Sequence, residues 1–343
     1  MRINKTNLVA VILAAGQSTR MKSKISKMLH PVCGRPIIRY VVDLVEALQA
    51  QQTIMVVGYQ AEKIKKELSQ RSIEFVFQKQ QLGTAHAVSQ TKESLSHFSG
   101  TVLVLNGDVP LLTFEEIKKL IDLHHTSQAA ATILSADIPE PFGYGRILRD
   151  EPGYVLEIVE EKDASEEQKK IKEINTGTYC FESQFLYNTL GKVNNQNVKK
   201  EYYLTDLIAL LRQQGELVQA LKVSDFRTAL GINTRVDLAE VNRIMRHRLL
   251  TQLMLEGVTF IDPNNTYIDF DVKIGKDTII GPGSMIEGAS FIGAECYIGP
   301  FSQIINSTLE DRVYIQGGCF ISNSRLPDGL QVGALRQIDQ RQQ

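Results

Sequence analysis

The chain has 343 residues, of which 43% are hydrophobic and 22% charged, and its formal net charge is −1. This balance is typical of a folded globular protein, and it argues against a disordered chain or a basic protein that binds nucleic acid. At this length we expect one large domain and one smaller one.

The sequence predicts a cytoplasmic protein without a membrane segment. The first thirteen residues lack the apolar stretch and cleavage site of a secretory signal, and no run of ~18 uncharged apolar residues occurs. Because Cys33, Cys180, Cys296 and Cys319 are widely separated and form no C-x-x-C pair, we expect reduced thiols rather than a zinc site.

Strand and helix patterns alternate through the first part of the chain. Apolar runs rich in β-branched residues occur at 8–13, 53–57, 73–77 and 101–105, between stretches of helical period at about 36–48, 61–69, 85–97 and 114–126. Strands are also expected near 130–136, 154–159 and 174–181, and a helix near 205–214. The pattern predicts an α/β domain with a mostly parallel sheet, which binds its ligands beyond the carboxyl ends of the strands.

A loop of small residues follows the first strand. It reads Leu13-Ala14-Ala15-Gly16, and the cations Arg20 and Lys27 follow. Such a loop lets backbone N–H groups approach phosphate oxygens, while the cations neutralise their charge. Neither the dinucleotide-binding nor the Walker pattern occurs here. The alternative is an ordinary tight turn beside surface cations.

Asp108 comes shortly after the strand at 101–105. A carboxylate at that place is suited to bind Mg²⁺ beside phosphates, although it could instead cap a turn. Further along, residues 78–87 have side-chain and backbone groups suited to the edge of a nucleobase, or else form a surface turn with Thr84 as the cap of the next helix.

The sequence pattern changes after a long helical stretch at about 235–255. From Ile268 to Ile304 an isoleucine recurs every six residues, a period that fits a hexapeptide β-helix whose isoleucines point into the core. The phase slips after Ile304 and resumes at Leu309. We expect about three coils before Pro327 and a poorly ordered polar tail after it.

Several ordered motifs resemble one family of nucleotide-sugar pyrophosphorylases, the bacterial N-acetylglucosamine-1-phosphate uridylyltransferases. Besides the loop at 13–27, the motifs are Gln78, Gln81–Ala87, Gly107–Leu111, Gly143–Ile147, Ile158–Glu160, Glu173–Gly177, Glu201–Asp206 and Gly231–Asn233. The resemblance spans about residues 8–325. It implies a Rossmann-like nucleotidyltransferase domain followed by a short left-handed β-helix.

The resemblance implies Mg²⁺-dependent transfer of a uridylyl group from UTP to N-acetylglucosamine 1-phosphate, with Arg20, Lys27 and Asp108 as catalytic residues. Asp108 and Asn233 are the implied metal ligands, although a lone Asn more often forms an Asx turn or a helix cap. The implied nucleotide-binding residues are Leu13, Ala14, Ala15, Gly16, Gln78, Gln81, Gly83, Thr84, Asn106 and Gly107. The implied sugar-binding residues are Gly145, Glu160, Asn175, Tyr203 and Thr205.

The predicted domains are a nucleotidyltransferase domain at 1–233, a linking helix at 234–257, a β-helix at 258–327 and a tail at 328–343. By resemblance we expect a homotrimer formed through the β-helix, with no nucleic-acid or membrane partner. Members with the full β-helix also transfer acetyl groups with a histidine base in later coils. All six histidines of this chain precede the repeats, so we expect a truncated β-helix without acetyltransferase activity.

Three departures from the family pattern concern substrate choice. Ser26 stands where many members have proline, Asn106 where some have an aromatic residue, and Ala85 where a glycine is usual. They leave open a second hypothesis, a nucleotidyltransferase for another nucleotide and sugar 1-phosphate. A third hypothesis is a non-catalytic sensor of sugar nucleotides, which would release no pyrophosphate.

Overall fold

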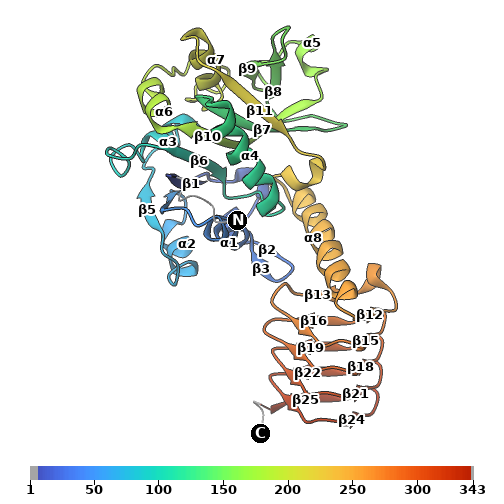
Figure 1. Cartoon of the computed structure of the whole chain (residues 1–343). Coiled ribbons are helices and arrows are strands. Elements are labelled where there is room, and N and C mark those ends of the chain that lie inside the picture. Colours follow the sequence, from blue (N-terminus) through green and yellow to red (C-terminus); the bar gives the residue numbers. More distant parts are fainter. Residues whose placement is uncertain (1–6, 341–343) are drawn as a thin grey trace. The chain divides into compact units, whose positions relative to one another are not determined.

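The computed structural model describes residues 7–340 (Figure 1). The chain divides into two compact units: the first contains the chain up to His30 and Ile37–Asp237, and the second contains Pro31–Pro36 and the chain from Leu238 onward. Residues 1–6 of the segment tested for a secretory signal, and residues 341–343 of the predicted tail, lie outside the described residues.

The first unit is built on a nine-stranded mixed sheet in which β1 is central. β1 pairs in parallel with β4 and β6, whereas β10 runs antiparallel to both β6 and β7. The path through the sheet is β11-β7-β10-β6-β1-β4-β5, with β8 and β9 off this path. The strands are β1 (Leu8–Ala14), β4 (Gln52–Val57), β5 (Glu74–Phe77), β6 (Thr101–Asn106), β7 (Ala131–Asp137), β8 (Arg146–Arg149), β9 (Val155–Val159), β10 (Glu173–Glu182) and β11 (Val218–Lys222).

Helices cover both faces of this sheet. Alternate residues of β1 accordingly belong to two different hydrophobic cores, one on each face. Leu8, Ala10 and Ile12 pack with α1, α2 and α4, whereas Val9 and Val11 pack with α3, α6 and α7. The helices of this unit are α1 (Ile37–Ala47), α2 (Ala61–Glu67), α3 (Thr84–Ser89), α4 (Phe114–Ser127), α5 (Glu166–Lys169), α6 (Ser183–Leu190) and α7 (Asp206–Gln213), whereas most of α8 (Arg235–Leu255) belongs to the second unit. The expected α/β fold with a mostly parallel mixed sheet is confirmed.

Several features of this unit were not expected from the sequence. The helix expected at 85–97 ends at Ser89 and continues as turns, and the helices α5 and α6 and the strands β8 and β11 had not been predicted. A further feature is an irregularity in β10, whose register against β7 shifts between Asn175 and Tyr179. Gly177 lies within the shift at φ +79°, a conformation that favours glycine.

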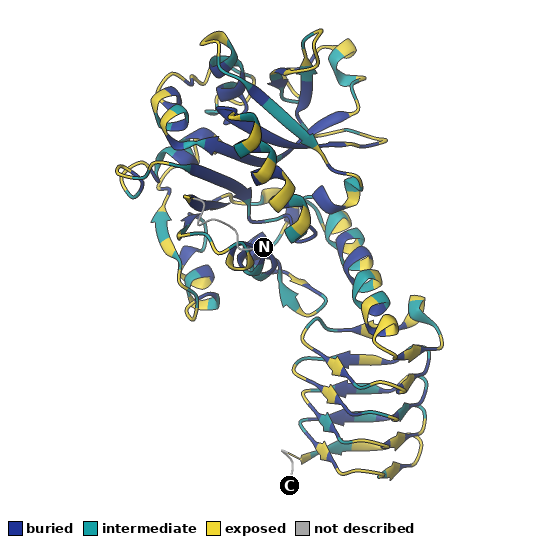
Figure 2. Cartoon of the chain, viewed as in Figure 1, coloured by how far each residue is buried: buried dark blue, intermediate teal, exposed yellow. Residues whose placement is uncertain are grey.

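The second unit contains a parallel β-helix whose short strands stack into three sheets of five, five and four strands. One residue of each strand points inward, so buried columns such as Ile280–Ile298–Ile315 form the core (Figure 2). The strands are β12 (Thr259–Phe260), β13 (Tyr267–Ile268), β14 (Lys273–Ile274), β15 (Ile279–Ile280), β16 (Met285–Glu287), β17 (Phe291–Ile292), β18 (Tyr297–Ile298), β19 (Gln303–Ile305), β20 (Thr308–Leu309), β21 (Tyr314–Ile315), β22 (Phe320–Ser322), β23 (Arg325–Leu326), β24 (Gln331–Val332) and β25 (Gln337–Asp339).

The phase slip after Ile304 is a shortened corner rather than a break in the β-helix. Hydrogen-bonded positions on successive coils are 18 residues apart at Thr278 and Cys296, but 17 apart at Ser290 and Ser307. At the shortened corners Asn306 and Asn323 adopt φ +46°, a left-handed conformation that Asn tolerates better than most residues.

The β-helix also continues past Pro327, where the sequence analysis ended it. β24 pairs with β21, and β25 pairs with β22, so the stretch expected to be a disordered tail forms part of another coil. Val332 is buried and Ile338 packs against the core. The polar residues around them hid the pattern, although Leu326, Val332 and Ile338 keep the six-residue step.

A hairpin formed by β2 (Pro31–Val32) and β3 (Arg35–Pro36) belongs to the second unit. The Cys33 N–H donates to Asn242 Oδ1 at 2.8 Å, and the Cys33 carbonyl accepts from Phe270 N at 2.9 Å. All four cysteines are free, and burial raises the pKa of the Cys33 thiol to about 12. In the described part of the chain, no helix has the length and apolar character needed to cross a membrane.

Candidate functional site

Two adjoining pockets lie in the first unit, beyond the carboxyl ends of β1 and β6. The larger has a volume of about 600 Å³ and is lined by the small-residue loop, and the smaller has a volume of about 200 Å³ and is lined by β10 and its neighbours. Both pockets share Leu13, Thr84, Asn106, Asp108 and Asn233. Because Leu13 pairs with Asn106, the two strands end together and place their loops at the same edge of the sheet.

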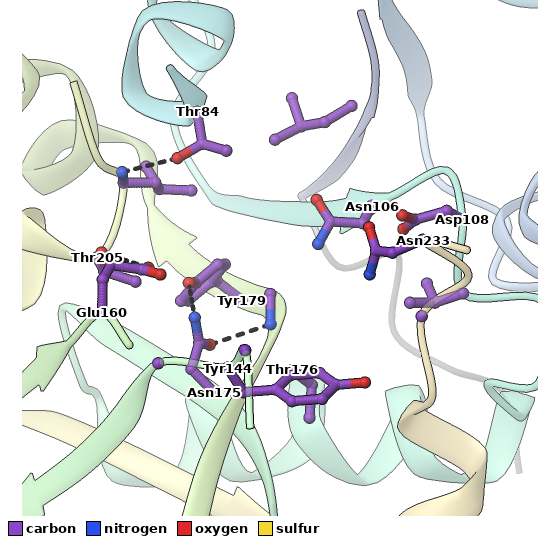
Figure 3. A pocket seen from close by; sticks show the side chains of 17 residues that line it. Thr84, Asn106, Asp108, Tyr144, Glu160, Asn175, Thr176, Tyr179, Thr205 and Asn233 are labelled. Carbon is purple, nitrogen blue, oxygen red and sulfur yellow. Dashed lines mark hydrogen bonds between the residues drawn. The ribbon is translucent and has the colours of Figure 1, made fainter. Parts of the chain in front are cut away.

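Two cations and two oxygen-bearing side chains meet where the pockets join. The Lys27 ammonium forms an ion pair with Asp108 and donates to Asn233 Oδ1 at 3.2 Å, and Arg20 Nη2 donates to the same Asn233 oxygen at 2.9 Å. Lys27 is only 8% exposed, so its charge acts in a medium of lower dielectric constant than water. Figure 3 shows Asp108, Asn106 and Asn233 together on one side of the smaller pocket.

The backbone of Asn233 is held by the start of α8. Asp237 accepts hydrogen bonds from the N–H groups of Asn233 and Thr234, at 2.9 and 2.8 Å, and its own N–H donates to Thr234 Oγ1 at 3.2 Å. Thr234 therefore has the role of helix cap that the sequence analysis had kept as an alternative for Asn233. The Asn233 side chain is left to contact Arg20 and Lys27.

The segment from Gln78 to Thr84 forms one wall of the larger pocket. Gln78 Nε2 contacts the Gly83 carbonyl at 3.2 Å and His86 Nδ1 at 2.9 Å, so hydrogen bonds fix the Gln78 amide. Thr84 does not cap α3: its Oγ1 accepts from the Leu204 N–H at 2.9 Å. Gly83 has φ +119° and lies against Tyr202, so a side chain at this position would collide with the Tyr202 backbone.

The smaller pocket brings Glu160, Asn175 and Thr205 together (Figure 3). Thr205 Oγ1 donates to Glu160 Oε1 at 3.1 Å, and burial raises the pKa of the Glu160 carboxyl above its usual range. Asn175 Nδ2 donates to the Tyr179 hydroxyl at 2.6 Å, and Asn175 Oδ1 accepts from the Gly177 N–H at 3.0 Å. The shift in β10 thus places Asn175 and Tyr179 beside each other.

Most of the residues predicted for the site line one of these pockets, and three do not. Ala14 is the buried last residue of β1, Gly107 donates its N–H to the Leu13 carbonyl at 2.9 Å, and Tyr203 is buried beneath the smaller pocket. The Tyr203 hydroxyl has no hydrogen-bond partner within residues 7–340. Lining residues absent from the predicted set include Ser18, Tyr144, Thr176, Gly177, Tyr179 and Glu201. Of these, all except Tyr179 fall within motifs that were noted in the sequence.

The side chains of Asp108 and Asn233 suit a hard divalent cation. Their oxygens already contact the same ammonium group of Lys27, so they lie close enough to act on one cation. Carboxylate and amide oxygens are typical Mg²⁺ ligands, and such sites usually take their other ligands from substrate phosphates and water. In the part of the chain that the structure describes, no three His, Cys, Asp or Glu side chains gather into a metal cluster.

Comparison with known proteins agrees with this geometry. Residues 10–169 match the family model for a MobA-like NTP transferase domain. A protein named bifunctional protein GlmU from Listeria monocytogenes serotype 4b is 47% identical over 324 residues, which are 94% of this chain and 70% of that relative. The chain belongs to the GlmU family.

Two further members of the GlmU family show similar likeness. The Enterococcus faecalis protein is 47% identical over 95% of this chain and 71% of its own length, and the Geobacillus thermodenitrificans protein is 49% identical over 90% and 67%. Membership of this family and the NTP transferase match confirm the expected nucleotidyl transfer. The reaction is the synthesis of UDP-N-acetylglucosamine from UTP. Proteins of this kind use a divalent metal for this reaction.

Proposed function

We propose that this chain joins UTP and N-acetylglucosamine 1-phosphate into UDP-N-acetylglucosamine and releases pyrophosphate, in the site formed by the two adjoining pockets. The observation that carries the proposal is the meeting of Arg20, Lys27, Asp108 and Asn233 at the junction of the pockets. A charged group bound there contacts two cations on one side and the sugar pocket on the other.

In this proposal the larger pocket holds the nucleotide. Gln78, Gln81, Gly83 and Thr84 face the uracil, and Leu13, Ala15, Gly16 and Asn106 form the floor under the ribose and phosphates. The smaller pocket holds the sugar. There Gly145, Glu160, Asn175 and Thr205 present carbonyl, carboxylate, amide and hydroxyl groups to the sugar hydroxyls and acetamido group, supported from below by Tyr203.

The reaction is a direct in-line displacement. A phosphate oxygen of the sugar 1-phosphate forms a bond to the α-phosphorus of UTP, and the bond from that phosphorus to the β-phosphate oxygen breaks, so that pyrophosphate leaves with the electron pair. Lys27 and Arg20 stabilise the negative charge that moves onto the phosphate oxygens, and the pocket walls align the two substrates. No covalent link to the protein forms.

Asp108 and Asn233 would hold Mg²⁺. The ion supplies Lewis-acid stabilisation of charge on the phosphate oxygens when it is bound. The Lys27–Asp108 ion pair keeps the Asp108 carboxylate directed toward the pocket junction, and the hydrogen bonds of Asp237 fix the backbone from which the Asn233 oxygen projects.

Pyrophosphate release in the presence of Mg²⁺ tests this function. UTP, dTTP, CTP, ATP and GTP are each combined with N-acetylglucosamine, N-acetylgalactosamine and glucose 1-phosphates. We expect turnover with UTP and N-acetylglucosamine 1-phosphate. Turnover with another pair only would keep the mechanism but reassign the substrates, and Asn106 would be the first residue to explain the change. No turnover with any pair would favour a non-catalytic sensor of sugar nucleotides.

We also propose that this chain does not transfer acetyl groups, although its relatives are named bifunctional. Residues 258–343 contain no histidine, so none of these coils has an imidazole that could act as a general base. The test is loss of glucosamine 1-phosphate in the presence of acetyl-CoA and purified protein. Consumption above a protein-free control would contradict the proposal.

A homotrimer formed through the β-helix is the assembly we propose. Ile279, Tyr297 and Tyr314 follow one another along one sheet as outward side chains, and the rings of Tyr297 and Tyr314 stack 4.8 Å apart. This column offers apolar surface that a second copy can cover. Light scattering measures the mass, and a monomer at micromolar concentration would contradict the proposal.

A further inference from the structure

Arg146 is a buried charged residue that does not line the smaller pocket but directly follows Tyr144 and Gly145, which do. It is the first residue of β8 and pairs with Ile174 of β10 and Val159 of β9. Its side chain is only 2% exposed. A buried guanidinium is costly unless its surroundings compensate its charge, so the groups that contact it are under strong constraint.

Three groups from separate segments meet at this guanidinium. Arg146 Nη2 lies 2.7 Å from Glu161 Oε2 in an ion pair, and Arg146 Nη1 donates to the Tyr144 carbonyl. Nη2 also donates to the Lys169 carbonyl, at the end of α5, at 3.4 Å. The planar fork of arginine can engage several acceptors at fixed angles, which the single ammonium of lysine cannot do.

Two of these contacts, Tyr144 and Glu161, belong to the pocket wall or lie next to a residue of it. Tyr144 is itself part of the wall and precedes Gly145, whose carbonyl accepts from the Asn175 N–H at 2.9 Å. Glu161 follows Glu160, the carboxylate of the pocket. The Arg146 side chain therefore links the segment before β8 to the segment after β9, at the end of the β8–β9 pairing, where Arg146 lies opposite Val159.

We propose that Arg146 is a positioning residue that sets the width of the sugar pocket through Tyr144 and Glu161, without touching the substrate. The inference rests on the proposed function, because it assigns the smaller pocket to the sugar 1-phosphate. Losing the guanidinium removes this side-chain link between the two walls and leaves the Glu161 carboxylate without its countercharge. The residues that line the larger pocket do not include Arg146 or the three residues that its guanidinium contacts, Tyr144, Glu161 and Lys169.

The test compares steady-state kinetics of Arg146→Met, Arg146→Lys and Glu161→Gln with the wild type. Displaced supporting groups typically cost about 10–100-fold in affinity or activity. We expect Arg146→Met to raise KM for N-acetylglucosamine 1-phosphate by that factor while KM for UTP stays unchanged. Arg146→Lys retains the charge but loses the planar guanidinium, so its KM for the sugar 1-phosphate should lie between those of the wild type and Arg146→Met.

Arg149→Met is the matched control. Arg149 lies on the same strand and also forms an ion pair, at 2.7 Å with Glu173, and its other hydrogen bond within residues 7–340 goes to the Gly153 carbonyl rather than to Tyr144 or Glu161. Its KM for the sugar 1-phosphate should match the wild type. Hydrogen exchange supplies a second readout: the amides of 143–145 and 160–161 should exchange faster in Arg146→Met, whereas those of 78–84 should not.

The outcomes separate this inference from the proposed function. A wild type that is inactive with UTP and N-acetylglucosamine 1-phosphate overturns the function, and the inference with it. An active wild type with an unchanged sugar KM in Arg146→Met, or with equal rises for both substrates, overturns the inference alone. If Arg146→Met does not fold, Arg146→Lys and Glu161→Gln decide by the same comparison.

Discussion

The Lys27 ammonium lies 3.2 Å from the Asn233 side-chain oxygen, although 206 positions of the sequence separate the two residues. The same ammonium pairs with Asp108, so one buried cation joins the loop after β1, the loop after β6 and the segment before α8. In the proposed function, the charged groups on these three segments bind the phosphates of the substrates.

Lys27→Ala should lower kcat by about 10²–10³, by analogy with the loss of one donor from an oxyanion hole, because Lys27 stabilises charge that develops during the reaction. Pyrophosphate release at saturating substrates measures kcat. Lys24→Ala is the control, since Lys24 is exposed. A kcat for Lys27→Ala equal to that of the control would remove Lys27 from the catalytic residues.

Gly177→Ala should lower kcat/KM, and it should lower Tm no more than a control substitution at another glycine with a positive φ. An added Cβ would lie 2.2 Å from Asn106 Nδ2, and the flexible Asn106 side chain would swing away from both pockets. Gly215→Ala is the matched control because Gly215 has a similar φ, +83°, with open space around it. Both substitutions carry the cost of a positive φ for alanine, about 1–2 kcal/mol, so Tm should fall similarly while kcat/KM falls only for Gly177→Ala. Equal activities would show that Asn106 does not contribute to the site.

The pH dependence of sugar binding should report Glu160. Burial raises its carboxyl pKa, so this group takes up a proton at a higher pH than an ordinary glutamate and then no longer accepts hydrogen bonds from the sugar with both oxygens. We expect kcat/KM for the sugar 1-phosphate to decline as the pH falls through that raised pKa. In Glu160→Gln the acid decline should vanish along with most of the activity, whereas Glu157→Gln on β9 should retain the wild-type profile.

Asp237→Ala should weaken both the start of α8 and the site. Loss of a capping interaction costs about 0.5–2 kcal/mol, and here it also frees the backbone of Asn233. Denaturant unfolding gives the stability change, and a titration of Mg²⁺ against activity gives the second effect. The Mg²⁺ concentration for half-maximal activity should rise. Stability loss without that rise would mean that Asp237 serves the helix only.

Ile304→Ala should destabilise the β-helix. Ile304 is fully buried in the column that continues to Ile321, and removing three carbons from a packed core costs about 2–5 kcal/mol. Ile305→Ala, on the next residue and outside the core, should cost clearly less. The free energies of unfolding of the two variants make the comparison. Equal losses would mean that the column does not carry the stability of the coils.

Much of the fold could be predicted from periodicity. Long apolar runs such as Val102–Leu105 and the six-residue recurrence of isoleucine are signals that arise within a few residues of each other. The features that the sequence analysis missed depend on distant partners. The register shift at Gly177 forms because β10 must pair with β7 on both sides of it, and α3 ends at Ser89 although the helical pattern continues to about residue 97.

For the site, the ordered motifs indicated which residues belong together but not how they meet. Nothing in the sequence indicates that Asn233 accepts from Arg20, or that Thr84 contacts the backbone at Leu204 rather than capping its helix. Arg146 stood within a noted motif, yet its role depends on burial against Glu161. Burial of this kind is a property of the folded chain.

The regular coil of the β-helix limits how this part of the chain can change in length. Deleting one whole coil would leave every inward side chain inward and every outward column, such as Tyr297 over Tyr314, in phase. Deleting one residue within a strand would bring isoleucines to the surface of the coils that follow, whereas the corner before Ser307 already has one residue fewer and keeps Leu309 inward. The β-helix can therefore change in length by whole coils or at its corners, but not within its strands.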